Sequence, residues 1–313
     1  MLVLTPENYY SKEANAEYMS QSTIKDYCEC WHKGELIHEL DRRDEVIDFK
    51  LDIIFKVGNF LHSFMEGEKA HKDFCWQNKD YIYVSATCQK MLDALTEAGF
   101  KVPKNSKKEL LIQALKDNNI PAPKGTMRAE FIKGEEMIDA MLAQNNIVEM
   151  RRASIANEKI ITFEFEGLNF KSAIDVEMPN SYADYKTTAN FDDVWWDGNK
   201  DRWSELKAHR GYVSWIQGKG ILEQQGLYQH ALELTTGQVK RCLIAAVTKE
   251  KHPQAQIFEL SQKSLDWGLA RFRKMVKYYK AAKQDWIPKH YCGKCAECAK
   301  MQKGIEQANF TEI

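Results

Sequence analysis

Residues 170–186 have the sequence Phe-Lys-Ser-Ala-Ile-Asp-Val-Glu-Met-Pro-Asn-Ser-Tyr-Ala-Asp-Tyr-Lys. Apolar and polar residues alternate as far as Glu177, which is the period of a half-buried strand, and Pro179-Asn-Ser181 predicts a turn before the next strand. We expect Asp175 on the first strand, and Asp184 and Lys186 two residues apart on one face of the second. If these strands pair, two carboxylates and a lysine share one pocket.

These three side chains suit phosphodiester chemistry. One or two protein carboxylates, with water and a substrate phosphate, form the oxygen shell that Mg²⁺ prefers. A lysine beside them can position the attacking water and offset charge at the scissile phosphate. An Asp-x-Lys motif alone is common as an ordinary ion pair at a strand end, and it is Asp175, nine residues upstream of Asp184, that favours the catalytic interpretation. Glu177 and Glu164 are further candidate metal ligands that rank below Asp175.

The rest of the chain predicts an α/β fold with a mixed sheet and a helical N-terminal part. A hairpin is expected from Thr162 to Glu177 and a polar connection from Trp195 to Gly211. The further predicted strands are 182–188, 241–248 and 256–260. The predicted helices are 20–31, 55–66, 86–98, 135–150, 215–235 and 264–286.

The stretch 99–128 predicts a small basic helical insertion within a single domain that spans residues 1–313. It carries seven Lys or Arg against two acids, and prolines lie near both of its ends. Its helical periodicity allows two interpretations, a solvated helix face or a surface that contacts phosphates.

Composition bounds the class of protein. The chain has 313 residues, 44% of them hydrophobic, and a formal net charge of −1, so a disordered or miniprotein class is excluded. The net charge alone gives no hint of nucleic acid, but 200–219 and 271–303 are also locally basic and contain aromatic residues. No uninterrupted apolar stretch predicts a membrane span, and no secretory signal is recognised at the start, so a reducing cytoplasm is expected.

Ile174-Asp-Val-Glu177 followed by Asp184-Tyr-Lys186 resembles the signature of PD-(D/E)xK nucleases. Gly58-Asn-Phe-Leu-His62 is similar to the Gly-x-x-x-His helix of their RecB/RecE-like branch, and Gln224-Gln-Gly-Leu-Tyr228 is similar to its Gln-x-x-x-Tyr helix. The chain most resembles the phage and prophage exodeoxyribonuclease VIII-like (RecE-like) family, which also shares the opening Leu4-Thr-Pro-Glu-Asn-Tyr-Tyr.

The resemblance implies a restriction-endonuclease-like core and roles for six residues. Asp175 and Asp184 would hold Mg²⁺ or Mn²⁺ with His62 beside the metal, and Lys186 would position the water. Gln224 and Tyr228, at i and i+4 on one helical face, would orient the phosphate.

The same resemblance implies an activity and a setting. Such enzymes digest double-stranded DNA without sequence preference, with 5′ to 3′ polarity as the best-motivated direction. They work beside a single-strand annealing recombinase in phage-type recombination, in the cytoplasm of a bacterial host cell. Related exonucleases form rings, although no feature of this sequence indicates an oligomer. An endonuclease of the same superfamily, or a non-catalytic DNA-binding or partner-binding protein on this scaffold, is the alternative.

The sequence Cys292-Gly-Lys-Cys295-Ala-Glu-Cys298 predicts a metal site, because clustered thiolates in a reducing compartment are typical metal ligands. Segment 20–31 resembles the N-terminal part of iron–sulfur RecB-type nucleases, in which one N-terminal and three C-terminal cysteines hold a [4Fe–4S] cluster. The resemblance implies that residues 20–30 and 288–300 form a staple, with Cys30 as the fourth ligand and Cys28 as the alternative. Zn²⁺ is the rival metal, and His290 could then replace a cysteine. Cysteines that bind no metal are the third alternative.

Overall fold

The computed structural model describes residues 2–46, 49–84, 86–103, 106–121, 123, 125–198, 200–203, 210–295 and 297–301. The chain divides into two compact units. One consists of Met1–Asp52 and Asp139–Ile313, and the other is Ile53–Ile138. Each unit is described by itself.

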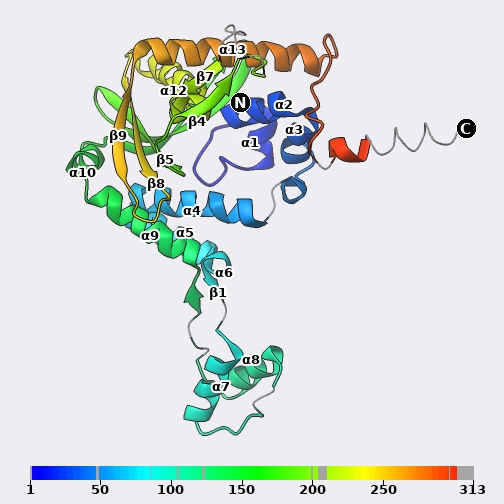
Figure 1. Cartoon of the computed structure of the whole chain (residues 1–313), viewed down its shortest axis with the longest axis vertical. Helices are drawn as coiled ribbons and strands as arrows, with labels where there is room; N and C mark the ends of the chain where they lie inside the picture. Colours follow the sequence, from blue (N-terminus) through cyan, green and yellow to red (C-terminus); the bar gives the residue numbers. More distant parts are fainter. Residues whose placement is uncertain are drawn as a thin grey trace, which may run out of the picture. The chain divides into compact units, whose positions relative to one another are not determined.

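A five-stranded mixed sheet forms the centre of the first unit (Figure 1). Its order is β3-β4-β5-β8-β9, in which β5 and β8 are parallel and the other neighbours are antiparallel. The strands are β3 (Ala156–Phe165), β4 (Leu168–Glu177), β5 (Ser181–Thr188), β8 (Arg241–Thr248) and β9 (Ala255–Leu260). The predicted α/β fold with a mixed sheet is therefore confirmed.

The β3–β4 hairpin turns at Glu166 and Gly167, which have φ values of 51° and 72°. Two consecutive residues with positive φ are typical of the type I′ turn, whose twist matches that of paired strands. The register runs from Phe165 opposite Leu168 to Ala156 opposite Glu177. The predicted hairpin is confirmed, and its tight turn fixes which residues of the two strands lie opposite each other.

Helices α12 (Ile221–Thr236) and α13 (Gln262–Lys283) pack together on one side of the sheet (Figure 1). Their backbones approach closely at two glycines. A Cβ atom at Gly226 would lie 2.5 Å from the Leu265 carbonyl oxygen, and one at Gly268 would lie 2.1 Å from the Leu222 carbonyl oxygen. Only glycine fits at these positions, so the sequence fixes where the two helices cross.

The region between β5 and β8 differs from the prediction. The helix expected over 215–235 is two helices, α11 (Trp215–Gly218) and α12, because Gly220 adopts a left-handed conformation with φ 73°. The connection expected over 195–211 contains a two-stranded ribbon of β6 (Val194–Asp197) and β7 (Arg210–Val213). Glycine at 218 leaves room for the Val194 side chain, which a Cβ there would meet at 2.0 Å.

The N-terminal part is helical, as predicted. It contains α1 (Lys12–Glu17), α2 (Gln21–Glu29), α3 (Trp31–His38) and a 3₁₀ turn at Arg43–Glu45. Ser20 caps α2, since its Oγ accepts a hydrogen bond from the Thr23 N–H at 3.1 Å. The rings of Tyr27 and Trp31 pack against Tyr279 of α13, with centroids 5.1 and 5.9 Å apart. These aromatic contacts hold α2 and α3 against the helical layer of the first unit.

The second unit has a small core of its own. Its elements are most of α4 (Phe49–Glu66), α5 (Glu68–Gln77), α6 (Lys79–Ile82), β1 (Tyr83–Val84), α7 (Cys88–Glu97), α8 (Lys108–Asp117), β2 (Thr126–Met127) and most of α9 (Ala129–Leu142), while α10 (Asn145–Arg152) belongs to the first unit. Leu92 and Leu95 of α7 pack with Leu111 and Leu115 of α8. The predicted insertion 99–128, whose residues 104, 105, 122 and 124 lie outside the described ones, contributes α8 and β2 to this unit.

Among the residues described, no helix combines the length and the apolarity that crossing a membrane requires.

A buried ion pair stabilises the end of β4. Glu177 and Lys240 are each only 3% exposed. Lys240 Nζ donates to Glu177 Oε1 at 2.7 Å, and Lys159 Nζ lies 2.7 Å from the other carboxylate oxygen. Burial would raise the pKa of Glu177, but the two ammonium groups outweigh burial and hold the pKa below its ordinary value. Glu177, a candidate metal ligand on sequence grounds, therefore has both oxygens engaged by lysines.

Replacing this carboxylate tests the energetics of the sheet. We expect Glu177→Gln to lower the free energy of unfolding by about 3 kcal/mol, because the charge of Lys240 stays buried without a counter-ion. The folded-state pKa of Glu177 lies below its unfolded value, so its contribution is present above the unfolded pKa and lost as pH falls through the folded one. Urea unfolding at neutral and acidic pH should therefore show a difference between wild type and variant that shrinks in acid.

The matched control is Glu259→Gln, which removes an exposed partner of Arg241 at 3.5 Å. Its effect should stay within about 0.5 kcal/mol. Equal effects of the two substitutions would contradict the assigned role of Glu177.

Candidate active site and cysteine cluster

Strands β4 and β5 separate after a short ladder, and the candidate site lies where they diverge. Only Val176 opposite Ala183 and Glu177 opposite Tyr182 pair between them, whereas β5 pairs with β8 along its whole length. Beyond the ladder, Asp175 Oδ2 accepts a hydrogen bond from the Tyr185 N–H at 2.7 Å. The Asp175 carboxylate thus takes the place of a main-chain acceptor, directly between the positions of Asp184 and Lys186.

Asp184 and Lys186 form a close pair at this point. Asp184 is 2% exposed, and Lys186 Nζ lies 2.5 Å from its Oδ2. Burial would lower the pKa of Lys186, but the negative charges of Asp184 and Asp175 outweigh it and raise the pKa above its ordinary value. Lys186 is therefore an ammonium ion at neutral pH.

Gln224 and Tyr228 lie on α12, and Gln224 Nε2 donates to Tyr228 Oη at 3.0 Å. Burial raises the pKa of Tyr228 well above its ordinary value, and the charges of Asp184 and Asp175 raise it further. The phenol therefore stays protonated within the field of both carboxylates. The structure brings together five of the six catalytic residues predicted from the sequence.

The sixth residue, His62, lies on α4 in the second unit. Its place beside the metal stays a prediction.

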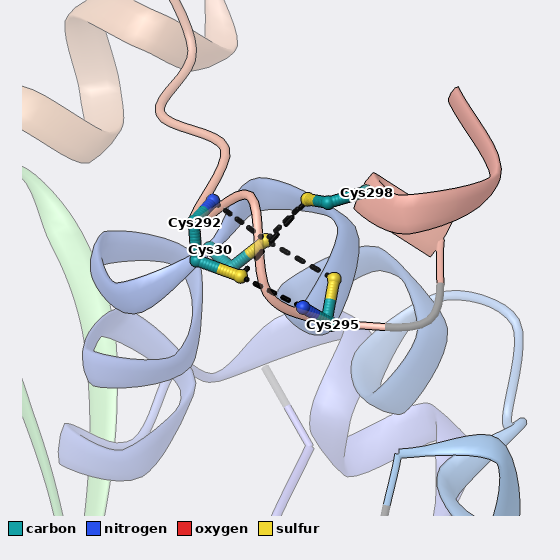
Figure 2. A group of neighbouring side chains, drawn as sticks. All are labelled: Cys30, Cys292, Cys295 and Cys298. Atoms are coloured by element: carbon teal, nitrogen blue, oxygen red, sulfur yellow. Dashed lines mark hydrogen bonds between the residues drawn. The ribbon is translucent and has the colours of Figure 1, made fainter. Parts of the chain in front are cut away.

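The four predicted cysteine ligands gather in one cluster, shown in Figure 2. Cys30 lies between α2 and α3, and the other three follow α13. The Sγ atom of Cys30 lies 3.6 Å from that of Cys298 and 3.8 Å from that of Cys295, and the Cys292 and Cys298 sulfurs are 4.0 Å apart.

Of the two N-terminal candidates, the cluster contains Cys30. Cys28 is buried elsewhere, with its Sγ 3.6 Å from the Met275 carbonyl oxygen. His290 contributes its carbonyl, which accepts the Trp31 N–H at 2.7 Å, and its ring is not among the four grouped ligands.

The family described as "PDDEXK-like domain of unknown function (DUF3799)" matches residues 20–301. The chain belongs to this PDDEXK-like family. The predicted membership of the PD-(D/E)xK superfamily is thereby confirmed.

A solved structure agrees with the fold of the PDDEXK-like chain. It is the crystal structure named "Putative exonuclease" from Eubacterium rectale, with 22% sequence identity and a TM-score of 0.69. The match covers 96% of this chain and 94% of that one, so nearly the whole architecture is shared. A search of curated proteins found no match.

The donors of the PDDEXK-like site fit a hard divalent cation. Asp184 Oδ2 is buried, and its contact with the Lys186 ammonium at 2.5 Å is an ion pair without regular hydrogen-bond geometry. The lone pairs of this carboxylate oxygen can therefore be taken by a bound cation. Carboxylate oxygens are the ligands that Mg²⁺ and Mn²⁺ prefer. Asp175 and Asp184 are therefore the residues that would hold such an ion.

Glu158 is a neighbour of the site that the sequence motifs did not indicate. The hairpin register places it opposite Asp175, and one carboxylate oxygen of each residue lies within 4.8 Å of the other. Its φ of 47° is uncommon for a residue other than glycine, and such strain is often found at functional sites. Counting back from the Glu166-Gly167 turn would have located it, because a two-residue turn fixes the register of the whole hairpin.

The hydrogen bond between Asp175 and Tyr185 gives a prediction that separates structure from chemistry. Asp175→Asn retains an oxygen acceptor for the Tyr185 N–H, whereas Asp175→Ala leaves that donor without its partner. We expect the alanine variant to be less stable than the asparagine variant by about 1–3 kcal/mol in urea unfolding. Equal stabilities would show that the carboxylate does not hold the strands in place.

Proposed function

We propose that this chain is a metal-dependent deoxyribonuclease in which Asp175 and Asp184 hold Mg²⁺ or Mn²⁺. The observation that carries the proposal is the position of the Asp175 carboxylate, bonded to the Tyr185 N–H beside the buried Asp184 and the charged Lys186. When bound, the cation would activate a water molecule and neutralise charge at the scissile phosphate.

Three further side chains, Lys186, Tyr228 and His62, have proposed roles at the site. Lys186, whose Nζ lies 2.5 Å from Asp184 Oδ2, would position the attacking water and offset negative charge at the phosphate. Tyr228 accepts a hydrogen bond from Gln224. The hydroxyl proton of Tyr228 is available for donation to a phosphate oxygen. The proposed position of His62 beside the metal rests on the family resemblance.

The proposed substrate is double-stranded DNA bound without sequence preference. The basic stretch 271–303, whose residues 296, 302 and 303 lie outside the described ones, contributes less to DNA binding than its sequence suggests. Arg273 and Lys277 face Glu166, and Lys283 bonds Glu39. Arg271 is buried in ion pairs with Asp201 and Glu223. Much of this positive charge therefore stabilises the fold.

The resemblance to the RecE-like family supports a more specific proposal. The chain would be a 5′ to 3′ exonuclease of phage-type recombination that works with a single-strand annealing recombinase in the cytoplasm of a bacterial host. None of the eight cysteines, all of which lie in the described part of the chain, forms a disulfide, and this supports a reducing compartment.

The decisive experiment is digestion of end-labelled linear duplex DNA with Mg²⁺ and with EDTA. We expect degradation only with the cation, and a loss of at least about 100-fold for Asp184→Asn and for Lys186→Met, because each removes a charge that acts on the transition state. Asp266→Asn, an exposed position at the start of α13, is the control and should retain the wild-type rate.

The same assay distinguishes the alternatives. Release of the 5′ label before the 3′ label supports the proposed polarity, and nicking of covalently closed circles would instead identify an endonuclease. DNA binding without cleavage under all metal conditions would contradict nuclease activity and favour a binding protein on this scaffold.

A further inference from the structure

The spacing of the four sulfurs limits what the cysteine cluster can hold. Three pairs of Sγ atoms are separated by 3.6, 3.8 and 4.0 Å, and all four atoms lie within 4.8 Å of one another. Zn²⁺ bound by four thiolates has Zn–S bonds of about 2.3 Å, so the sulfurs at the corners of the tetrahedron lie about 3.8 Å apart. The measured separations match a single tetrahedral ion.

An iron–sulfur cubane would need a wider arrangement. Each of its four irons carries one thiolate that points away from the cluster, which spreads the cysteine sulfurs to roughly 6 Å apart. With all four sulfurs within 4.8 Å of one another, the cubane core has no room between them. The residues present therefore do not fit the cluster that the family resemblance implies.

Hydrogen bonds to sulfur support a compact thiolate shell. The N–H groups of Lys294 and Cys295 donate to Cys292 Sγ at 3.4 and 3.3 Å, and the Cys292 N–H donates to Cys30 Sγ at 3.5 Å. Figure 2 shows the loop wrapping around the sulfurs, with the Cys292 and Cys295 nitrogens directed at them. Donors arranged in this way compensate the negative charge that four thiolates bring to one ion.

We propose that Cys30, Cys292, Cys295 and Cys298 form a mononuclear tetrathiolate zinc site in place of a [4Fe–4S] cluster. Four protein ligands fill the tetrahedral shell, so no position remains for water or substrate and the site is structural. It joins the α2–α3 junction to the segment after α13, which are more than 260 positions apart along the chain. A hydrogen bond also joins these two segments, since the Trp31 N–H donates to the His290 carbonyl oxygen at 2.7 Å.

The metal content of the full-length chain tests the proposal directly. The protein is expressed with both iron and zinc supplied and purified without oxygen, so that an oxygen-sensitive cluster would survive. Elemental analysis and an assay for acid-labile sulfide should give about one zinc per chain and negligible iron and sulfide. About four irons with sulfide would overturn the proposal, as would a chain that holds no metal.

Two cysteine variants assign the ligands. Cys30→Ser should lose the zinc, whereas the control Cys28→Ala, two residues away and buried outside the cluster, should keep about one zinc per chain. Retention of zinc by Cys30→Ser, or its loss from Cys28→Ala, would contradict the ligand set.

A measurement on the wild-type chain covers the case in which Cys30→Ser does not fold. Exchange of the zinc for Co²⁺ should produce the intense visible absorption of tetrahedral thiolate-bound cobalt. The pale spectrum of octahedral oxygen-bound cobalt would overturn the proposal. Because metal content and spectrum are read without DNA, the outcome is independent of whether the chain is a nuclease.

Chelation should loosen the junction without unfolding the sheet, because none of the four ligands lies on a strand of the sheet. Hydrogen exchange after zinc removal should rise several-fold in the cysteine loop and at the start of α3, while β5 and β8 keep their protection. Unchanged exchange in both segments would contradict a structural role.

Discussion

The hydrogen bond from the Tyr185 N–H to Asp175 Oδ2 is the contact on which the candidate active site depends. Strands β4 and β5 stop pairing at the point where Asp175 is reached, so the peptide group of Tyr185 would lose its acceptor. The Asp175 carboxylate supplies a hydrogen-bond acceptor for this peptide group, and the bond keeps the carboxylate beside Asp184 and Lys186. A single side chain thus satisfies the backbone and contributes an oxygen donor, which explains why the sheet can open here at low cost.

The surrounding fold holds the other side of this opening rigid. Strand β5 is paired with β8 along its whole length, and this fixes the backbone at Asp184. Helix α12 approaches α13 closely at Gly226 and Gly268. This close packing determines the position of Tyr228, whose pKa is raised by the negative charges of Asp175 and Asp184. The buried pair of Glu177 and Lys240 anchors the far end of the short β4–β5 ladder.

The strands of the central sheet and the Asp175, Asp184 and Lys186 set could be predicted from local periodicity and motif spacing. Cys30 as the fourth cysteine could be predicted from the family resemblance. The break at Gly220 could not, since a glycine within a helical pattern is compatible with either a continuous or an interrupted helix. Glu158 was missed because its role comes from a partner on the next strand. The acidic partners of the basic residues on α13 could not be predicted, because they are distant in sequence. Tertiary pairing decided the last two cases.

The most direct test of this account is a crystal structure of the wild-type chain soaked with Mn²⁺, with the ion located by its anomalous scattering. The account predicts a Mn²⁺ peak within bonding distance of carboxylate oxygens of both Asp175 and Asp184, with the Asp175 to Tyr185 hydrogen bond retained. Absence of a peak between these carboxylates at saturating Mn²⁺, or an ion bound elsewhere in the first unit instead, would contradict the claim that the divergence of β4 and β5 forms a metal-dependent active site.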